Sequence, residues 1–235
     1  EAVILSCFNP ERRMIAQFVL EQLIADGRIH PARIEETVER AKKELESLLL
    51  EKGEQAAFDL SITDLHPQII RSLGQLSLRH TGSQSILQHS VETANICAHM
   101  ASELKINLKL ARRAGLLHDI GNAVDQEKSG HHATLGAKFC AKYGEKKEIC
   151  DAIELHHSDN LLKASSLAVI LGAANKLSAN RPGARSDTLE SYIKRLTEIE
   201  DFVCNYSEEI SSAYVLQAGR EIRVMLNAEI VDDNE

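Results

Sequence analysis

The chain has no tryptophan, and aromatic residues make up only 4% of its 235 residues. Proteins that bind single strands without sequence preference stack bases on aromatic side chains, so a stacking platform of that kind is not expected. No apolar run approaches the roughly 18 residues of a membrane span, and no signal peptide is visible. The 5 cysteines are scattered, odd in number and never spaced as C-x-x-C. This pattern argues against a disulfide framework or a zinc finger and fits a reducing cytosol.

The chain has fewer basic than acidic residues, 27 against 35, so its formal net charge is −8. This balance argues against a protein that coats nucleic acid through bulk charge. A local basic groove beside a metal is compatible with it, because the metal itself attracts phosphate.

Leucine, isoleucine and alanine supply most of the apolar content, which favours helices over strands. Asn9-Pro10 predicts the start of a helix and Gly27 its end. Pro31 opens a longer helix that we expect to end at Gly53. Its single apolar stripe predicts either packing on a neighbouring helix or pairing between chains.

From residue 66 onward the pattern predicts a succession of helices. They are expected near residues 67–76, 85–103, 107–119, 134–143, 146–157, 165–180 and 187–206. Alternation and β-branching predict a strand at residues 221–226. A strand-like run also occupies residues 2–6 with no turn before it, which indicates a piece of a longer protein.

Histidine is concentrated, because seven of the ten histidines lie between residues 89 and 157. An apolar helix is expected to end in the adjacent pair His118 and Asp119, with Gly121 stopping it. An imidazole nitrogen beside a carboxylate oxygen suits a divalent metal such as Mn, Fe, Mg, Ni or Zn. His89 alone would be interpreted as a core histidine, but the second helix ending in His-Asp favours a metal ligand.

The order of His89, then His118-Asp119, then a later helix with a fourth ligand is similar to the HD phosphohydrolase superfamily. The surrounding stretches are more specific, and together they resemble the ribonuclease Y family over nearly the whole chain. These stretches are ADGRIHPARIEE, GEQAAF, LQHS, ARRAGLLHDIGNA, AKYGE, AIELHHSD, SANRPGARSDTLESYIKRL and QAGREIRV.

The resemblance implies a mainly α fold, an HD-type helical bundle with a partial KH remnant at the N-terminus and a short strand element near the C-terminus. Residues 1–52 would be the C-terminal part of a KH domain plus its following helix, and residues 53–235 the HD domain with a C-terminal extension. The KH Gly-x-x-Gly loop, which grips nucleic-acid backbone, is missing. The family also implies a cytoplasmic protein whose full-length form is anchored at the cytoplasmic face of the membrane.

Carried over from the family motif, the metal ligands are His89, His118, Asp119 and the residue at position 175. The family has Asp at that position, whereas this chain has Asn175. An amide oxygen can coordinate a hard cation but brings no negative charge, so metal affinity should fall. A second departure is Asn122, where the family usually has a lysine that could hold a phosphate oxygen.

Three further histidines, His132, His156 and His157, match ligands of the second metal in two-metal HD proteins. The alternative for the pair His156-His157 is a helix C-terminus that favours partial positive charge. His131 has no such match and is expected to face solvent.

Arg181 and Arg185 flank a Pro-Gly turn and could form a fork for substrate phosphate. A solvated loop is the alternative. A weaker basic stripe comprises Lys138, Lys142, Lys146 and Lys147.

The activity implied by the resemblance is metal-dependent endonucleolytic hydrolysis of single-stranded RNA in mRNA decay, with Asp119 and His118 as catalytic residues. Two alternatives stay open: a nucleotide phosphohydrolase or cyclic-dinucleotide phosphodiesterase, and a scaffold of an RNA-decay assembly weakened by Asn175. The partners expected are single-stranded RNA, a second copy in a homodimer, and other RNA-decay proteins.

Overall fold

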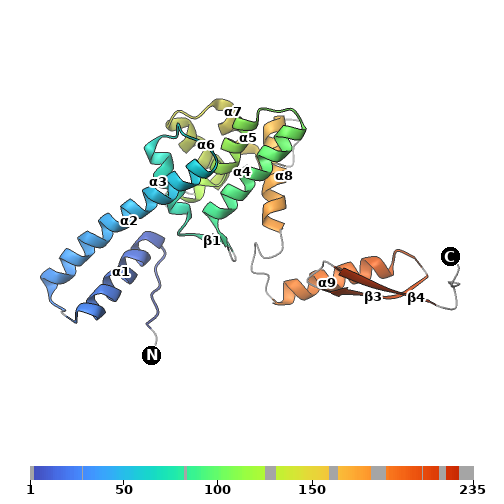
Figure 1. Ribbon diagram of the computed structural model, residues 1–235, viewed down its shortest axis with the longest axis horizontal. Coiled ribbons are helices and arrows are strands. Elements are labelled where there is room, and N and C mark those ends of the chain that lie inside the picture. Colours follow the sequence, from blue (N-terminus) through green and yellow to red (C-terminus); the bar gives the residue numbers. More distant parts are fainter. Residues whose placement is uncertain are drawn as a thin grey trace. The chain divides into compact units, whose positions relative to one another are not determined.

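The structure is a computed structural model, and it describes residues 3–27, 29–81, 84–124, 131–158, 164–180, 189–207, 209–216 and 221–227. The chain divides into two compact units, Glu1–Ala184 and Arg185–Glu235. Figure 1 shows that helices dominate the first unit, as the sequence predicts. Among the described residues, no helix is both long and apolar enough to cross a membrane.

The helices of the first unit follow one another with short connections. They are α1 (Pro10–Asp26), α2 (Pro31–Asp59), α3 (Pro67–Leu76), α4 (Ile86–Glu103), α5 (Leu108–Leu117), the 3₁₀ turn η1 (Ile120–Asn122), α6 (His132–Lys142), α7 (Lys147–Leu155) and α8 (Ser166–Asn180). A two-residue antiparallel pair, β1 (His80–Thr81) and β2 (Gln84–Ser85), precedes α4.

Local sequence signals explain several helix ends. The Asn9 side chain accepts hydrogen bonds from the backbone N–H groups of Glu11 and Arg12, at 2.9 and 3.3 Å, and caps α1. Gly27 ends α1 in the left-handed region, with φ of 68°. Ser85 and Gln88 form a reciprocal capping box at the start of α4, the helix that carries His89.

The prediction that Gly53 ends the second helix is wrong. Helix α2 continues through this residue to Asp59, so the expected domain boundary after residue 52 falls inside a helix. A Cβ at Gly53 would lie 2.0 Å from the carbonyl oxygen of Ile70 on α3. The glycine therefore allows the two helices to pack closely.

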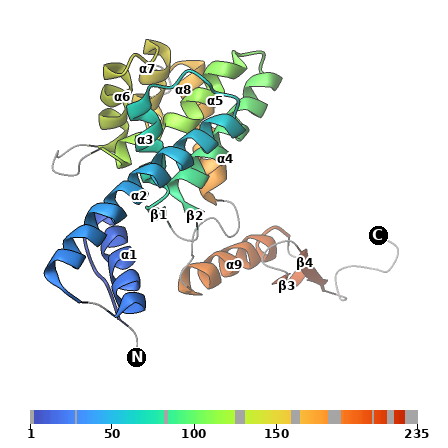
Figure 2. The same cartoon turned by 60° about the vertical axis from the view of Figure 1, so that its left-hand side comes forward.

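Figure 2 shows α1 beside the first half of α2. The apolar stripe predicted on α2 is therefore explained by packing against α1 within the chain.

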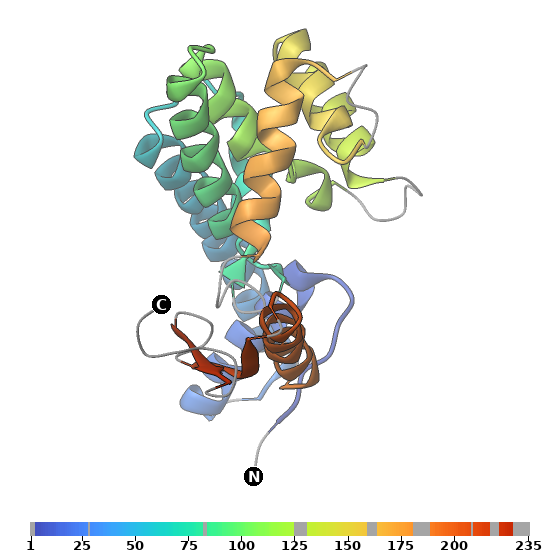
Figure 3. The same ribbon diagram turned by 90° about the vertical axis from the view of Figure 1, so that its right-hand side faces the viewer.

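The main core lies among α3 to α8 and comprises mostly leucine, isoleucine and alanine. Leu116 and Leu117 at the end of α5 are fully buried, and Gly115 lets α5 approach the backbone of Ala94 on α4. The chain therefore reaches His118 in the middle of the domain rather than at its surface. Figure 3 shows α8 beside α4, the two helices that supply His89 and Asn175.

The strand-like run at residues 2–6 is a second incorrect expectation, since no strand is assigned at residues 3–8. A strand requires a neighbouring ladder for its hydrogen bonds, and the described residues supply none there.

The second unit contains α9 (Leu189–Cys204) and an antiparallel pair, β3 (Ile210–Leu216) and β4 (Glu221–Leu226). The strand predicted at residues 221–226 is confirmed, whereas its partner β3 was not predicted. Ala213 and Val215 on β3 are buried, and the Glu200 carboxylate accepts a hydrogen bond from the Val215 N–H at 2.9 Å. The helix and the hairpin are thus joined within this unit.

Candidate metal centre

His118 follows directly after the buried end of α5 and is itself fully buried. Its Nδ1 lies 2.8 Å from the carbonyl oxygen of Gly115, which can only accept, so Nδ1 carries the ring proton. The lone pair of Nε2 is then free to bind, yet this atom is buried without any hydrogen-bond partner among the described residues. A buried polar atom of this kind is costly unless something pairs with it, as a cation would.

Asp119 places one carboxylate between two groups of histidines. Its Oδ2 lies 3.4 Å from His118 Nε2 and 3.8 Å from His89 Nε2. Its Oδ1 lies 3.5 Å from His132 Nε2 on the opposite side. Burial disfavours the charged carboxylate, but a proton on the neighbouring His118 Nε2 outweighs this, so without metal the pKa of Asp119 lies below its usual range and that of His118 above it. A bound cation would take the place of that proton.

His89 is oriented by a chain of hydrogen bonds across two helices. The Ser178 hydroxyl donates to Glu92 Oε2 at 3.0 Å, so its oxygen accepts from His89 Nδ1, 2.9 Å away. The amide nitrogen of Gln84 is also near His89 Nδ1, but at 3.5 Å this contact is at the limit of a hydrogen bond. The shorter contact therefore assigns the proton to Nδ1 and leaves Nε2 as the ligand atom.

Asn175 faces the same ligand atom. Its Oδ1 lies 3.0 Å from His89 Nε2, so two acceptors meet unless the amide is turned to present its nitrogen. A cation between the two atoms would satisfy both. The atoms that could hold it are the Nε2 atoms of His89 and His118, Asp119 Oδ2 and Asn175 Oδ1. Such a mixed nitrogen and oxygen set fits a divalent metal of the borderline or hard kind.

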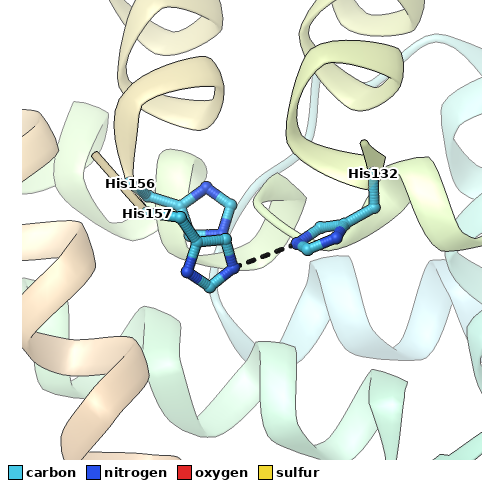
Figure 4. A group of neighbouring side chains, drawn as sticks. All are labelled: His132, His156 and His157. Atoms are coloured by element: carbon cyan, nitrogen blue, oxygen red, sulfur yellow. Dashed lines mark hydrogen bonds between the residues drawn. The ribbon is translucent and has the colours of Figure 1, made fainter. Parts of the chain in front are cut away.

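The second group comprises His132, His156 and His157, whose ligand atoms lie within 4.8 Å of one another (Figure 4). His156 repeats the arrangement of His118: its Nδ1 contacts the carbonyl oxygen of Ile153 at 2.6 Å, and its buried Nε2 has no partner among the described residues. Burial lowers the pKa of His156 to about 3, and the nearby His118 adds to the shift. The imidazole is therefore neutral and able to coordinate.

His132 and His157 come close enough to share a cation or a proton. Their Nε2 atoms are 3.1 Å apart, and burial lowers the pKa of both side chains. Gly121 makes this geometry accessible, because a Cβ there would lie 1.9 Å from the carbonyl oxygen of His132. The glycine predicted to stop a helix instead lets η1 contact the start of α6, which positions His132 beside Asp119.

The structure brings together all seven predicted ligand side chains, in the two groups described above. Asn122, at the position where a lysine was expected, donates to Asp119 Oδ1 at 3.2 Å. His131 is exposed, as predicted, and caps α6. Arg181 and Arg185, the predicted phosphate fork, lie outside the described residues.

Sequence reasoning missed the two residues that orient His89. Glu92 follows His89 by three positions on α4, and Ser178 follows Asn175 by three positions on α8. Residues three apart share a helix face, so this spacing was a usable signal.

The family described as HD domain matches residues 86–193, which include His89, His118, Asp119 and Asn175. The predicted HD domain is thereby confirmed.

The particular relatives are ribonuclease Y proteins. The chain is 54% identical to ribonuclease Y of Oleidesulfovibrio alaskensis over 234 residues, which are 100% of this chain and 45% of that protein. It is 52% identical to ribonuclease Y of Geobacter sulfurreducens over 99% of this chain and 44% of that protein. For ribonuclease Y of Acetivibrio thermocellus the identity is 51%, over 100% of this chain and 44% of that protein. The chain thus spans somewhat less than half the length of these relatives, and the resemblance seen in the sequence is confirmed.

Proposed function

We propose that this chain is the catalytic part of a metal-dependent endoribonuclease that hydrolyses phosphodiester bonds of single-stranded RNA. One observation carries the proposal: among the described residues, the buried Nε2 atoms of His118 and His156 have no hydrogen-bond partner, and the two rings lie 5.3 Å apart, with His118 Nε2 at 3.4 Å from the Asp119 carboxylate. The relatives named ribonuclease Y support RNA as the substrate.

The first group of residues, His89, His118, Asp119 and Asn175, would hold one divalent cation, and His132, His156 and His157 with Asp119 would hold a second. When bound, such cations supply Lewis-acid chemistry, because they polarise a phosphoryl oxygen and make water more acidic. Asp119 contributes an ionised carboxylate with one oxygen toward each group, so it can orient an attacking water by accepting its hydrogen bond. Ser178 and Glu92 keep the His89 lone pair directed at the site.

Arg181 and Arg185, which flank a Pro-Gly turn in the sequence, are proposed to hold the adjacent phosphate. We also propose that the protein is a cytoplasmic homodimer with further RNA-decay partners, and that the N-terminal part of the chain is the remnant of a KH domain.

The test is hydrolysis of an oligouridylate and of bis-p-nitrophenyl phosphate with Mg, Mn, Zn or no metal. Metal-dependent cleavage of both is expected, with a loss of at least about a hundredfold in Asp119→Asn, the scale of a lost general base. Asp151→Asn, an exposed change on α7, is the matched control. Turnover of a cyclic dinucleotide without RNA cleavage would assign the site to nucleotide hydrolysis instead. Failure to bind any metal would favour the scaffold.

A further inference from the structure

A cavity of about 980 Å³ lies beside the metal centre but is lined by none of its histidines. Its walls come from three separate parts of the first unit: the first turn of α1 with the residues before it, α3 with the residues after it, and α6. Ala123 and Val124, which directly follow η1, complete the lining.

Four cationic side chains line this cavity: Arg12, Arg79, Lys138 and Lys142. Among the described residues, no acidic side chain forms an ion pair with any of them. Arg71 also lines the cavity, but Glu46 binds it at 2.8 Å and Glu11 at 3.5 Å.

Glu11 is the one acidic residue in the lining, and its carboxylate is engaged by Arg71. The cavity wall is therefore strongly positive in a chain whose net charge is −8. Cations gathered from three segments repel one another, and an anionic ligand would relieve this repulsion.

The placement of the lysines favours a polyanion over a single phosphate. Lys138 and Lys142 are one helical turn apart on α6, a separation of roughly 6 Å along the axis. That separation is close to the distance between successive phosphates of a single strand. Phe8 adds a largely exposed aromatic ring, at 84% exposure, on which a base can stack.

Helix α6 connects the cavity to the site of reaction. The helix begins at His132, whose Nε2 lies 3.5 Å from Asp119. Lys138 and Lys142 follow at about 9 and 15 Å along the helix axis, at roughly 1.5 Å per residue. A strand bound at the metal centre could therefore continue along α6 into the cavity.

We propose that the cavity lined by Arg12, Arg79, Lys138 and Lys142 binds the phosphate backbone of single-stranded RNA whose scissile bond lies at the metal centre. This inference rests on the proposed function, since it assigns the RNA contact of the same site. It also gives an otherwise acidic chain a local attraction for RNA.

The experiment measures binding of a fluorescein-labelled oligouridylate to the full chain in the presence of a chelator, across a range of salt concentrations. The test variant is the double change Lys138→Gln and Lys142→Gln. The matched control is Lys43→Gln with Lys52→Gln, which removes the same charge from exposed positions on α2 outside the cavity. We expect the test variant to bind about tenfold more weakly. Its slope of log K against log salt should be shallower by about 1.4, or about 0.7 for each lost phosphate contact.

Several outcomes overturn the inference. Unchanged binding by the test variant, an equal loss in the control, or absence of RNA binding by the metal-free parent would each do so. If an acidic peptide bound the parent more tightly than RNA does, and the test variant did not bind this peptide, the cavity would be a protein-docking site.

Hydrolysis of bis-p-nitrophenyl phosphate separates this failure from failure of the proposed function. The substrate is too small to reach from the metal centre to the lysines, so the test variant should hydrolyse it at the parental rate while its cleavage of the long oligouridylate falls. If the parent hydrolyses neither substrate with any metal, the proposed function fails, whatever the binding data give.

Discussion

At the scale of single residues, the centre is built from imidazoles whose protons are assigned by their neighbours. His118 and His156 donate Nδ1–H to a carbonyl three residues earlier, and His89 donates to Ser178. Each ring therefore presents Nε2 toward the interior. Such outer contacts fix both the tautomer and the orientation of a ligand before any metal arrives.

We propose that Asn175 weakens this centre, because its amide brings no negative charge. Asn175→Asp would replace a neutral oxygen beside His89 Nε2 with a charged one, and metal affinity should rise by about tenfold. Isothermal titration calorimetry with Mn measures this. Asn180→Asp, at an exposed position of the same helix, adds the same charge away from His89 and should change little. Equal affinities for the parent and Asn175→Asp would remove position 175 from the ligand set.

Ser178 should act on the metal through His89. Ser178→Ala removes the acceptor of the His89 Nδ1 proton, and metal affinity should fall by about 10- to 100-fold. The ¹⁵N shifts of His89 in the metal-free protein should change from one tautomer to a mixture, which a purely structural role would not produce. Ser166→Ala, on the exposed first turn of α8, is the control. An unaltered His89 tautomer would show that Ser178 does not position the ring.

At the scale of elements, the helices of the first unit were largely predictable because caps and apolar spacing are local signals. The helix predicted at residues 67–76 coincides with α3, and α4 and α8 begin within one residue of expectation. Glycines were misinterpreted at Gly53 and Gly121. A glycine that ends a helix and one that admits a neighbouring backbone look alike in sequence, and only the tertiary neighbour distinguishes them.

The site itself was predictable in composition but not in arrangement. The family motif supplied the seven ligand side chains, yet the sharing of Asp119 between two groups depends on how η1 meets α6. The strand β3 was missed because buried and exposed residues alternate along only part of it, and because its pairing with β4 depends on residues further along the chain.

Gly121→Ala tests that junction between elements. The added Cβ would meet the carbonyl oxygen of His132 at 1.9 Å, so α6 must shift and the free energy of unfolding should fall by about 1–3 kcal/mol. Metal binding should weaken in the folded protein as well, because His132 moves away from Asp119. Gly53→Ala meets Ile70 just as closely, at 2.0 Å, but Gly53 on α2 and Ile70 on α3 lie on helices that carry none of the seven ligand side chains. It should lose stability and keep metal affinity. Urea unfolding measures the stability of both variants, and calorimetry measures their metal affinity. An equal loss of metal binding in both variants would contradict this account.

At the scale of the whole molecule, the histidine-rich core links folding to pH. Burial lowers the pKa of His89, His132, His156 and His157 below the ordinary value of 6.5. Between each folded pKa and 6.5 the unfolded chain therefore binds more protons than the folded one. These four groups therefore make stability rise with pH across this window and fall as the pH drops below about 6.5. His118 acts in the opposite direction, because the charge of Asp119 outweighs burial and raises its pKa, and the stability that it contributes is lost as the pH rises above 6.5. Asp119 has the same effect as the four groups, but at lower pH. Its pKa is lowered in the folded protein, so the stability that it contributes is lost as the pH falls below the ordinary pKa of 3.8.

The urea midpoint for unfolding of the metal-free protein should therefore fall continuously as the pH falls from about 6.5 toward 4. His156→Gln removes the most strongly shifted of these groups, whose folded pKa is about 3, so its midpoint should vary less steeply with pH. His99→Gln replaces an exposed histidine and should follow the parent curve. Saturating metal should raise the midpoint, and the midpoint should still fall as the pH drops, because a cation that binds only the folded state competes with protons for the same nitrogens and binds more weakly at low pH. A parent midpoint that stays constant over this range would mean that the histidines are not held neutral in the folded core, and the tautomers assigned above would then be wrong.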